Sequence, residues 1–187
     1  MITRTNIINN LIKKHNYQNY LEIGISLAAN FNKINCKNKT GVDPDPESSN
    51  HLKECNIKTS DVFFKDNEEP FDIIFIDGLH EAEQVYNDII NSLNCLAEGG
   101  TIVCHDMLPP NELCQIVPRQ QTEWTGDCWK AWVRLRYERS DLSMQVLNTD
   151  YGCGIIQRGH QERISYKTLT WEEFQQNKQE WLNIIEN

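Results

Sequence analysis

Phe71-Asp-Ile-Ile-Phe-Ile-Asp77 is the stretch of sequence that decides the fold class of this chain. Its nearly continuous apolar run is typical of a strand that is buried on both faces of a parallel sheet. An amphipathic helix is predicted next, over residues 81–97, with Gly99 at its C-terminal cap. Gly100-Thr-Ile-Val-Cys104 then reads as a second buried strand. A strand, a helix and a strand of these lengths predict a βαβ unit with parallel strands.

The same alternation extends toward the N-terminus. Residues 5–15 have apolar side chains at helical spacing, and strands are predicted over Tyr20–Gly24 and Lys39–Asp43. A short helix over residues 47–55 and a weak strand over residues 57–59 complete this part. Strands that alternate with helices in this way predict a doubly wound α/β fold, in which ligands bind beyond the carboxyl ends of the strands.

The C-terminal part begins with a break in this rhythm. Residues 107–123 contain prolines that exclude a continuous helix or central strand, so a long loop is expected, which is either a lid over a site or a plain surface excursion. The capping box Thr170-Trp-Glu-Glu173 opens a last helix. The other predicted elements are a helix over 127–138 and strands over 143–147 and 154–157, joined by a turn at 150–152. We expect one domain over residues 1–187.

Composition excludes several classes of protein. The formal net charge is −9, which argues against binding of nucleic acid through a general phosphate-binding surface. No run approaches the roughly 18 apolar residues of a membrane span, and no signal peptide is visible, so a cytoplasmic protein without a membrane partner is expected. The seven cysteines are odd in number and contain no Cys-x-x-Cys pair, which predicts reduced thiols.

The first two predicted strands end at residues that suit a nucleotide-like ligand. Gly24 allows the backbone to approach a ligand closely, and Asp43 is placed to accept both hydroxyls of a ribose. Residues 24–30 contain one glycine, which argues against the Gly-x-Gly-x-x-Gly loop of dinucleotide enzymes. Glu22 is interpreted either as a pocket residue or as a surface residue of the strand.

The order and spacing of five motifs resemble those of the class I S-adenosylmethionine (SAM)-dependent methyltransferases. The motifs are Leu21-Glu-Ile-Gly-Ile25, Thr40-Gly-Val-Asp-Pro-Asp45, Thr59-Ser-Asp-Val-Phe-Phe64, Phe71-Asp-Ile-Ile-Phe-Ile-Asp-Gly-Leu-His80 and Gly99-Gly-Thr-Ile-Val-Cys-His-Asp106. The chain is most similar to the small bacterial group that includes the macrolide-sugar O-methyltransferases. This resemblance implies a Rossmann-like, mostly parallel seven-stranded sheet with helices on both faces and an antiparallel C-terminal hairpin.

The resemblance also implies which residues bind SAM. Ala28 stands where the family has a second glycine, and its methyl group is expected to narrow the loop. The implied cofactor residues are Glu22, Gly24 and Ser26 at the methionine, Asp43 at the ribose, Ser60 and Asp61 at the adenine, and Asp77 at the same site.

Acidic and imidazole side chains follow the next two strands, at Asp77, His80, His105 and Asp106. If these strands are neighbours, Asp77, His105 and Asp106 converge on a metal site. Carboxylates suit Mg²⁺ or Ca²⁺, whereas imidazole favours Mn²⁺ or another transition metal. His80 is a candidate general base beside Asp77. In the alternative interpretation, His80 only begins the next helix and Asp77 only binds backbone amides at a strand end.

A basic stretch follows the long loop and has two interpretations. Lys130, Arg134, Arg136 and Arg139 form either an anion-binding patch or, as we favour, a set of cations near a helix C-terminus. Of the nearby tryptophans, Trp124 is expected to be exposed.

The leading hypothesis is a SAM-dependent methyltransferase that methylates the hydroxyl of a small acceptor such as a sugar or glycan precursor, assisted by a divalent metal. Oxygen and nitrogen acceptors are not distinguished by the sequence. Two alternatives stay open: a metal-dependent hydrolase that uses Asp77, His105 and Asp106, and a non-catalytic SAM-binding protein of the same fold.

Overall fold

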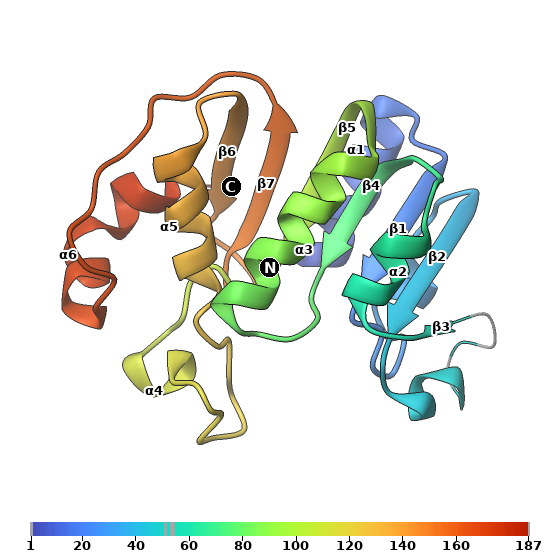
Figure 1. The fold of residues 1–187 in the computed structure, drawn as a ribbon, viewed down its shortest axis with the longest axis horizontal. Coiled ribbons are helices and arrows are strands. Elements are labelled where there is room, and N and C mark those ends of the chain that lie inside the picture. The colour runs from blue at the N-terminus through green and yellow to red at the C-terminus, as the bar shows by residue number, and fades with distance from the viewer. Residues whose placement is uncertain (1, 51, 53–54, 187) are drawn as a thin grey trace.

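The computed structural model describes residues 2–50, 52 and 55–186. Its centre is a sheet with the strand order β3-β2-β1-β4-β5-β7-β6-β8 (Figure 1). Strands β1 to β5 are parallel, and β7 is antiparallel to both β5 and β6. The strands are β1 Asn19–Ile23, β2 Asn38–Asp43, β3 Asn56–Ile57, β4 Phe71–Ile76, β5 Leu96–Cys104, β6 Leu142–Leu147, β7 Cys153–Arg158 and β8 Ile184–Ile185. The predicted Rossmann-like sheet with an antiparallel C-terminal hairpin is therefore confirmed.

The sheet has eight strands in the described part of the chain, so the expected number of seven is wrong. The additional strand β8 pairs in parallel with β6, through Val146 and Ile184. It forms because Asn183 takes a left-handed conformation after the last helix and turns the chain back to the sheet edge.

Three of the helices, α1, α2 and α6, have a recognisable cap at one end. Thr59 and Thr170 accept hydrogen bonds from the backbone of Val62 and Glu173, which caps α2 and α6 at their N-termini. Asn16 ends α1 in a left-handed conformation. The α-helices are α1 Arg4–His15, α2 Ser60–Asp66, α3 Ala82–Cys95, α4 Glu112–Gln115, α5 Cys128–Glu138 and α6 Trp171–Leu182, with 3₁₀ turns at Phe31–Lys33 and Pro46–Asn50.

Strand β4 separates two apolar cores. Ile73 and Phe75 face the core beneath α1, whereas Ile74 and Ile76 face the core beneath α2, α3, α5 and α6. This alternation follows from the two-residue period of a strand, and all four side chains are buried. Helices thus cover both faces of the sheet, as predicted.

Several predicted boundaries are wrong. The helix over 81–97 ends at Cys95, because Leu96 is extended and pairs with Phe71, so β5 begins earlier than expected. Gly99 lies within that strand and caps no helix. Helix α2 is missing from the prediction. Residues 51 and 53–54 of the short helix expected over 47–55 lie outside the described residues, and β3 ends at Ile57.

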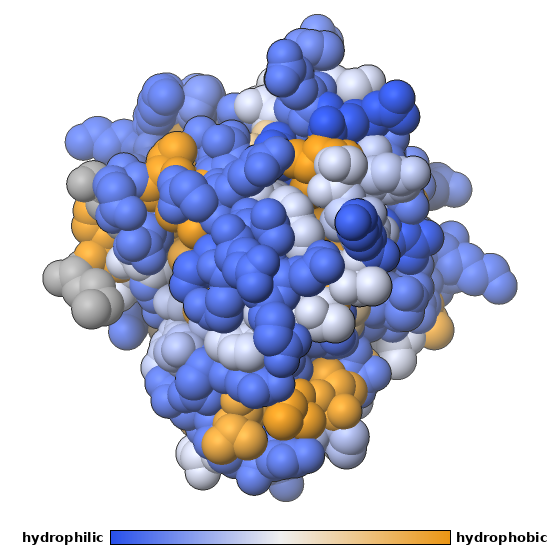
Figure 2. Space-filling model, turned by 90° about the vertical axis from the view of Figure 1, so that its left-hand side faces the viewer, coloured by the Kyte–Doolittle hydropathy of each residue, from blue (hydrophilic) through white to orange (hydrophobic). Residues whose placement is uncertain are grey.

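The loop over 107–123 contains the single turn α4 and carries an exposed apolar patch. Leu113 and Val117 are its exposed apolar side chains. Figure 2 shows a largely hydrophilic face with an apolar patch at the level of α4.

All seven cysteines are free, as predicted.

None of the described helices combines the length and the hydrophobicity that crossing a membrane requires.

Candidate functional site

A cavity of about 770 Å³ lies at the carboxyl ends of β1, β2, β4 and β5. This is the edge of the sheet where a doubly wound fold binds its ligands. The predicted site residues that line the cavity are Gly24, Ser26, Asp43, Ser60, Asp61, Asp77, His80, His105 and Asp106. Residues from five separate segments thus meet in one space.

The floor of the cavity is formed where β1 and β4 end side by side. Gly24 has φ +91°, and a Cβ atom there would lie 2.1 Å from the carbonyl oxygen of Asp77. Glycine is required here because the two backbones touch. Asp43 then fixes the loop after β1, since its carboxylate accepts hydrogen bonds from the backbone N–H of Ile25 (2.8 Å) and Ser26 (2.9 Å).

Ala28 lies in the same loop but not at the cavity. It has φ +56° and is completely buried in the core beneath α1. Its methyl group is not among the groups that line the cavity. The expectation that this methyl narrows the cofactor loop is therefore wrong, because the side chain points into the core.

Glu22 is buried beside the cavity, and it is not a surface residue. It is 2% exposed, accepts hydrogen bonds from the hydroxyl of Tyr20 and from Asn30 Nδ2, and is absent from the described cavity lining. Burial raises the pKa of Glu22 to about 7, although the hydrogen bonds from Tyr20 and Asn30 lower it. A direct contact between Glu22 and the cofactor stays a prediction.

The opposite end of the cavity has a polar group that sequence reasoning missed. Gln84 Nε2 donates to Ser60 Oγ (3.1 Å), Asp61 Oδ1 (3.3 Å) and Asp88 Oδ1 (3.0 Å). Burial raises the pKa of Asp88 to about 6. Gln84 and Asp88 are one turn apart on α3, so the polar interruption of the apolar stripe of that helix was the available signal.

Two carboxylates and two imidazoles form a closed ring at the ends of β4 and β5. His80 lies 3.4 Å from Asp77 and 3.2 Å from Asp106. His105 Nδ1 lies 3.3 Å from Asp77 Oδ1 and 3.1 Å from Asp106 Oδ1. The structure has the predicted convergence of Asp77, His105 and Asp106, because β4 and β5 are neighbours, and His80 joins them.

The charged groups of the ring shift one another's pKa values. Burial would raise the pKa of Asp77, but His105, His80 and Arg4 outweigh it and hold this pKa well below its usual range. Burial would lower the pKa of His80, but hydrogen bonding to Asp77 and the charge of Asp106 raise it. The carboxylate of Asp77 therefore stays ionised.

Trp124 fixes the orientation of His80. The two rings are stacked at 5.3 Å, and Trp124 is half-buried rather than exposed as expected. His80 Nδ1 faces two acceptors, Asp106 Oδ2 (3.2 Å) and the carbonyl oxygen of Trp124 (3.4 Å). Nε2 in turn faces the carboxylate of Asp77 at 3.4 Å, so both ring nitrogens face acceptors, and His80 acts as a general base only after it has given up one proton.

Arg4 is a second residue that sequence reasoning missed. Its Nη1 lies 2.6 Å from His105 Nε2, and its backbone N–H donates to Asp150 Oδ2 (2.7 Å). The carboxylates around His105 raise its pKa against the effect of burial, whereas this short contact requires a lone pair on Nε2. We favour the neutral tautomer with the proton on Nδ1, because Arg4 already supplies the positive charge at Nε2. No sequence signal connects Arg4 with Asp150, which are 146 residues apart.

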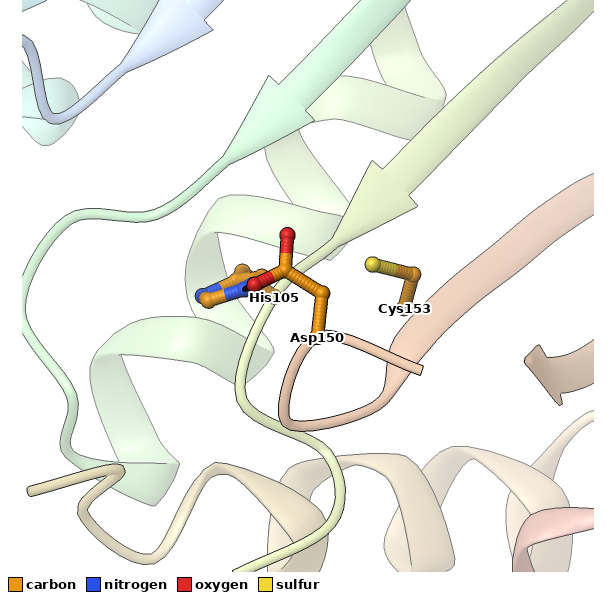
Figure 3. Close-up of side chains that lie close together, drawn as sticks. All are labelled: His105, Asp150 and Cys153. Atoms are coloured by element: carbon orange, nitrogen blue, oxygen red, sulfur yellow. Dashed lines mark ion pairs between the residues drawn. The ribbon is translucent and has the colours of Figure 1, made fainter. Parts of the chain in front are cut away.

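His105, Asp150 and Cys153 form a second group at the ends of β5 and β7 (Figure 3). Burial raises the pKa of the Cys153 thiol to about 12, so the thiolate that a metal would need is scarce at neutral pH. Both nitrogens of His105 are engaged, with Arg4 on one side and carboxylates on the other. This group is therefore better suited to hydrogen bonding than to metal binding.

The donor set of Asp77, His80 and Asp106 fits a divalent ion. One ligand atom from each lies within 4.8 Å of the others. The structure thus groups His80, rather than His105, with the two carboxylates, and His105 as a ligand stays a prediction. Two carboxylates and one imidazole suit Mn²⁺ or Mg²⁺.

The basic side chains of α5 are neutralised by nearby groups, and Lys130 lies in the first turn of the helix, so the expectation that all four cations lie near its C-terminus is wrong. Lys130 pairs with Asp127, Arg134 with Glu83 and Glu138, and Arg139 with Asp141. Arg136 is buried and donates to Gln161 Oε1 (2.8 Å). An anion-binding patch at these residues is not formed.

Comparison with known proteins agrees with this geometry. Residues 21–107 match the family model described as a methyltransferase domain. No curated protein matches the chain at a significant level.

Solved structures of methyltransferases share the fold at low sequence identity. The O-methyltransferase TomG from Streptomyces achromogenes, solved with SAM, has a TM-score of 0.64 at 12% identity, over 83% of this chain and 79% of that one. PaMTH1 from Podospora anserina, solved with S-adenosylhomocysteine (SAH), has a TM-score of 0.62 at 15% identity, over 85% and 80%. The N-methyltransferase NodS from Bradyrhizobium japonicum has a TM-score of 0.52 at 18% identity, over 82% and 92%.

Proposed function

We propose that this chain, which has the domain and the fold of the class I SAM-dependent methyltransferases, methylates a hydroxyl group of a small acceptor. One observation carries the proposal. Apart from Glu22, the residues expected to bind SAM line a single continuous cavity together with the ring of carboxylates and imidazoles. A donor pocket and a proton-accepting group in one space are what methyl transfer to a hydroxyl needs.

The cofactor half of the cavity fits SAM. Asp43, Ser60, Asp61, Gly24 and Ser26 all line it, so Asp43 would accept a ribose hydroxyl, Ser60 and Asp61 would lie at the adenine, and Gly24 and Ser26 would lie at the methionine. When bound, SAM supplies an electrophilic methyl group on a sulfonium. The N–H groups of Ile25 and Ser26 occupy Oδ2 of Asp43 and that of Asp45 occupies one site on Oδ1, so Oδ1 keeps one acceptor site for a ribose hydroxyl.

The reaction half supports removal of the acceptor proton. His80 Nε2 is held by the Trp124 stack and by the bonding of Nδ1, and Asp77 Oδ1 lies 3.4 Å away. His80 accepts the proton of the acceptor hydroxyl as its oxygen gains the methyl group. A divalent ion held by Asp77, His80 and Asp106, or by Asp77, His105 and Asp106, would lower the pKa of that hydroxyl. In the first case bulk water would take the proton, because His80 would be a ligand.

The acceptor side suits a hydroxylated ring such as a sugar or glycan precursor. Trp124 and Tyr151 present aromatic surface, and the Tyr151 hydroxyl donates to Glu123 Oε1 (2.7 Å). Flat aromatic faces combined with carboxylate acceptors match the apolar faces and the hydroxyl groups of such a ring.

Titration calorimetry with SAM, with and without Mg²⁺, tests the proposal on the wild type and Asp43→Ala. We expect binding by the wild type and a loss of about 10-fold or more in Asp43→Ala, with no change in the neighbouring control Asp45→Ala. No binding of SAM in any condition would contradict the proposal and leave the metal-dependent hydrolase. Binding without methyl transfer to any member of a panel of hydroxylated acceptors would indicate a non-catalytic SAM-binding protein.

A further inference from the structure

We propose that Arg4 binds the α-carboxylate of the methionyl group of SAM, while Asp77 and Asp150 hold its guanidinium at the cavity wall. This inference rests on the proposed function, because it takes SAM as the ligand. It gives the N-terminal turn of α1 a role in selecting a donor that carries an amino-acid head.

The first argument is chemical complementarity. Among the described residues that line the cavity, Arg4 is the one arginine or lysine. The methionyl head of SAM carries a carboxylate, and a guanidinium binds carboxylates through paired N–H donors. Asp77 and Asp150 beside Arg4 match the ammonium group of the same head.

The second argument is position. Arg4 Nε lies 3.9 Å from Asp77 Oδ2, and the backbone of Asp77 touches Gly24 and donates to Ile23 O (2.9 Å). Arg4 and the loop after β1 therefore flank the same residue. Thr5 Oγ1 also donates to Asn30 Oδ1 (2.7 Å), which ties the start of α1 to that loop. Arg4 thus lies at the methionine end of the cavity.

The third argument is that Arg4 is fixed in place but has donors to spare. The backbone N–H of Arg4 donates to Asp150, and Thr149 Oγ1 donates to Ile2 O (2.6 Å). The ion pairs of its side chain are long, at 3.8 and 3.9 Å, and the side chain is 33% exposed. Within the described part of the chain, its Nη2 makes no hydrogen bond. A guanidinium held in this way is preorganised for an anionic ligand.

Titration calorimetry with SAM and with decarboxylated SAM isolates the carboxylate, because both ligands carry the sulfonium and the ammonium. We expect the wild type to bind SAM about 10- to 100-fold more tightly than decarboxylated SAM, as a charge-assisted hydrogen-bonded pair implies. In Arg4→Ala this ratio falls to within about 3-fold, and Arg4→Lys is intermediate. The control Arg139→Ala removes a half-buried, Asp141-paired arginine that lies outside the cavity and keeps the wild-type ratio.

Thermal unfolding without ligand shows whether each variant is folded. A wild type that does not distinguish the two ligands, or an Arg4→Ala variant that keeps the wild-type ratio, overturns this inference but leaves the proposed function intact. The same holds if Arg4→Ala weakens both ligands equally, because Arg4 would then only support the site. If the wild type binds neither ligand, the proposed function fails as well.

Discussion

The two halves of the cavity are built in different ways. In the cofactor half, Asp43 accepts hydrogen bonds from backbone amides of Ile25, Ser26 and Asp45, so the path of the main chain makes the site. In the reaction half, side chains from distant segments contact each other, as Arg4 does with His105. The cofactor half should therefore be sensitive to changes of backbone path, and the reaction half to changes of charge.

The largest effect is expected from Gly24→Ala in the cofactor half. The added Cβ would lie 2.1 Å from the carbonyl oxygen of Asp77, and φ is +91°. Left-handed strain and overpacking together are expected to reduce the free energy of unfolding by roughly 2–5 kcal/mol, as measured by urea denaturation. Titration calorimetry should show no SAM binding.

Gly99→Ala is the matched control for this substitution. Gly99 also has a positive φ, of +72°, but a Cβ there would meet nothing within 4 Å. Only the backbone cost of about 1–2 kcal/mol is expected, with SAM affinity unchanged. Equal losses in the two variants would show that the contact between β1 and β4 is unimportant.

Asp77→Asn tests the reaction half by removing charge while keeping shape. The rate of SAH release in the presence of an accepted acceptor should fall at least about 100-fold, because the amide neither accepts a proton nor holds a cation. The free energy of unfolding should fall by about 1–3 kcal/mol, since His105 and Arg4 lose a buried partner.

Asp141→Asn is the corresponding control outside the cavity. The hydrogen bond from Arg139 lowers the pKa of Asp141 to about 2, but this carboxylate is exposed. Its loss should change stability by less than about 0.5 kcal/mol, because solvent screens the pair. If Asp77→Asn were as mild as this control, the charged ring would not organise the site.

The contrast between the halves also explains what the sequence could predict. Gly24 and Asp43 were found because Gly24 directly follows β1 and Asp43 ends β2, and strand ends meet at one edge of a parallel sheet. Asp77, His80, His105 and Asp106 were found for the same reason. Local pattern is sufficient wherever the fold itself brings consecutive strand ends together.

Arg4 and Asp150 were missed because their position depends on tertiary packing. Arg4 begins the first helix and Asp150 lies in the last hairpin, so their contact exists only once β7 lies beside β5. Asp88 was missed because it lies in a helix whose apolar stripe dominates the pattern. The end of the helix at Cys95 was misplaced because pairing with β4 overrides the helical periodicity.

Glu22 is expected to make the free energy of unfolding depend on pH. Its pKa is raised from 4.5 to about 7, so the folded state binds the proton more tightly than the unfolded state does. Stability contributed by the protonated form is complete below pH 4.5 and is lost as the pH rises through 7, by up to about 3 kcal/mol. Glu22→Gln should remove this loss, because the amide is neutral at every pH.

Urea denaturation at a series of pH values tests this expectation. The stability of Glu22→Gln relative to the wild type should increase between pH 4.5 and 7 and then level off. Asp88→Asn is a useful companion variant. Burial raises the pKa of Asp88 to about 6, so the stability of this variant relative to the wild type should level off at a lower pH than that of Glu22→Gln. A difference between Glu22→Gln and wild type that does not change with pH would show that Glu22 is ionised in its buried network.

The smallest effect is expected from Ala28→Gly, which restores the glycine of the family motif. Glycine relieves the left-handed strain at φ +56°, but it loses a buried methyl group and gains freedom in the unfolded chain. These terms oppose each other, so stability should change by less than about 1 kcal/mol. SAM affinity should change less than about 3-fold, since Ala28 faces the core. A tenfold gain in affinity on titration would instead place Ala28 at the cofactor, and would show that side chains as well as backbone shape this half of the cavity.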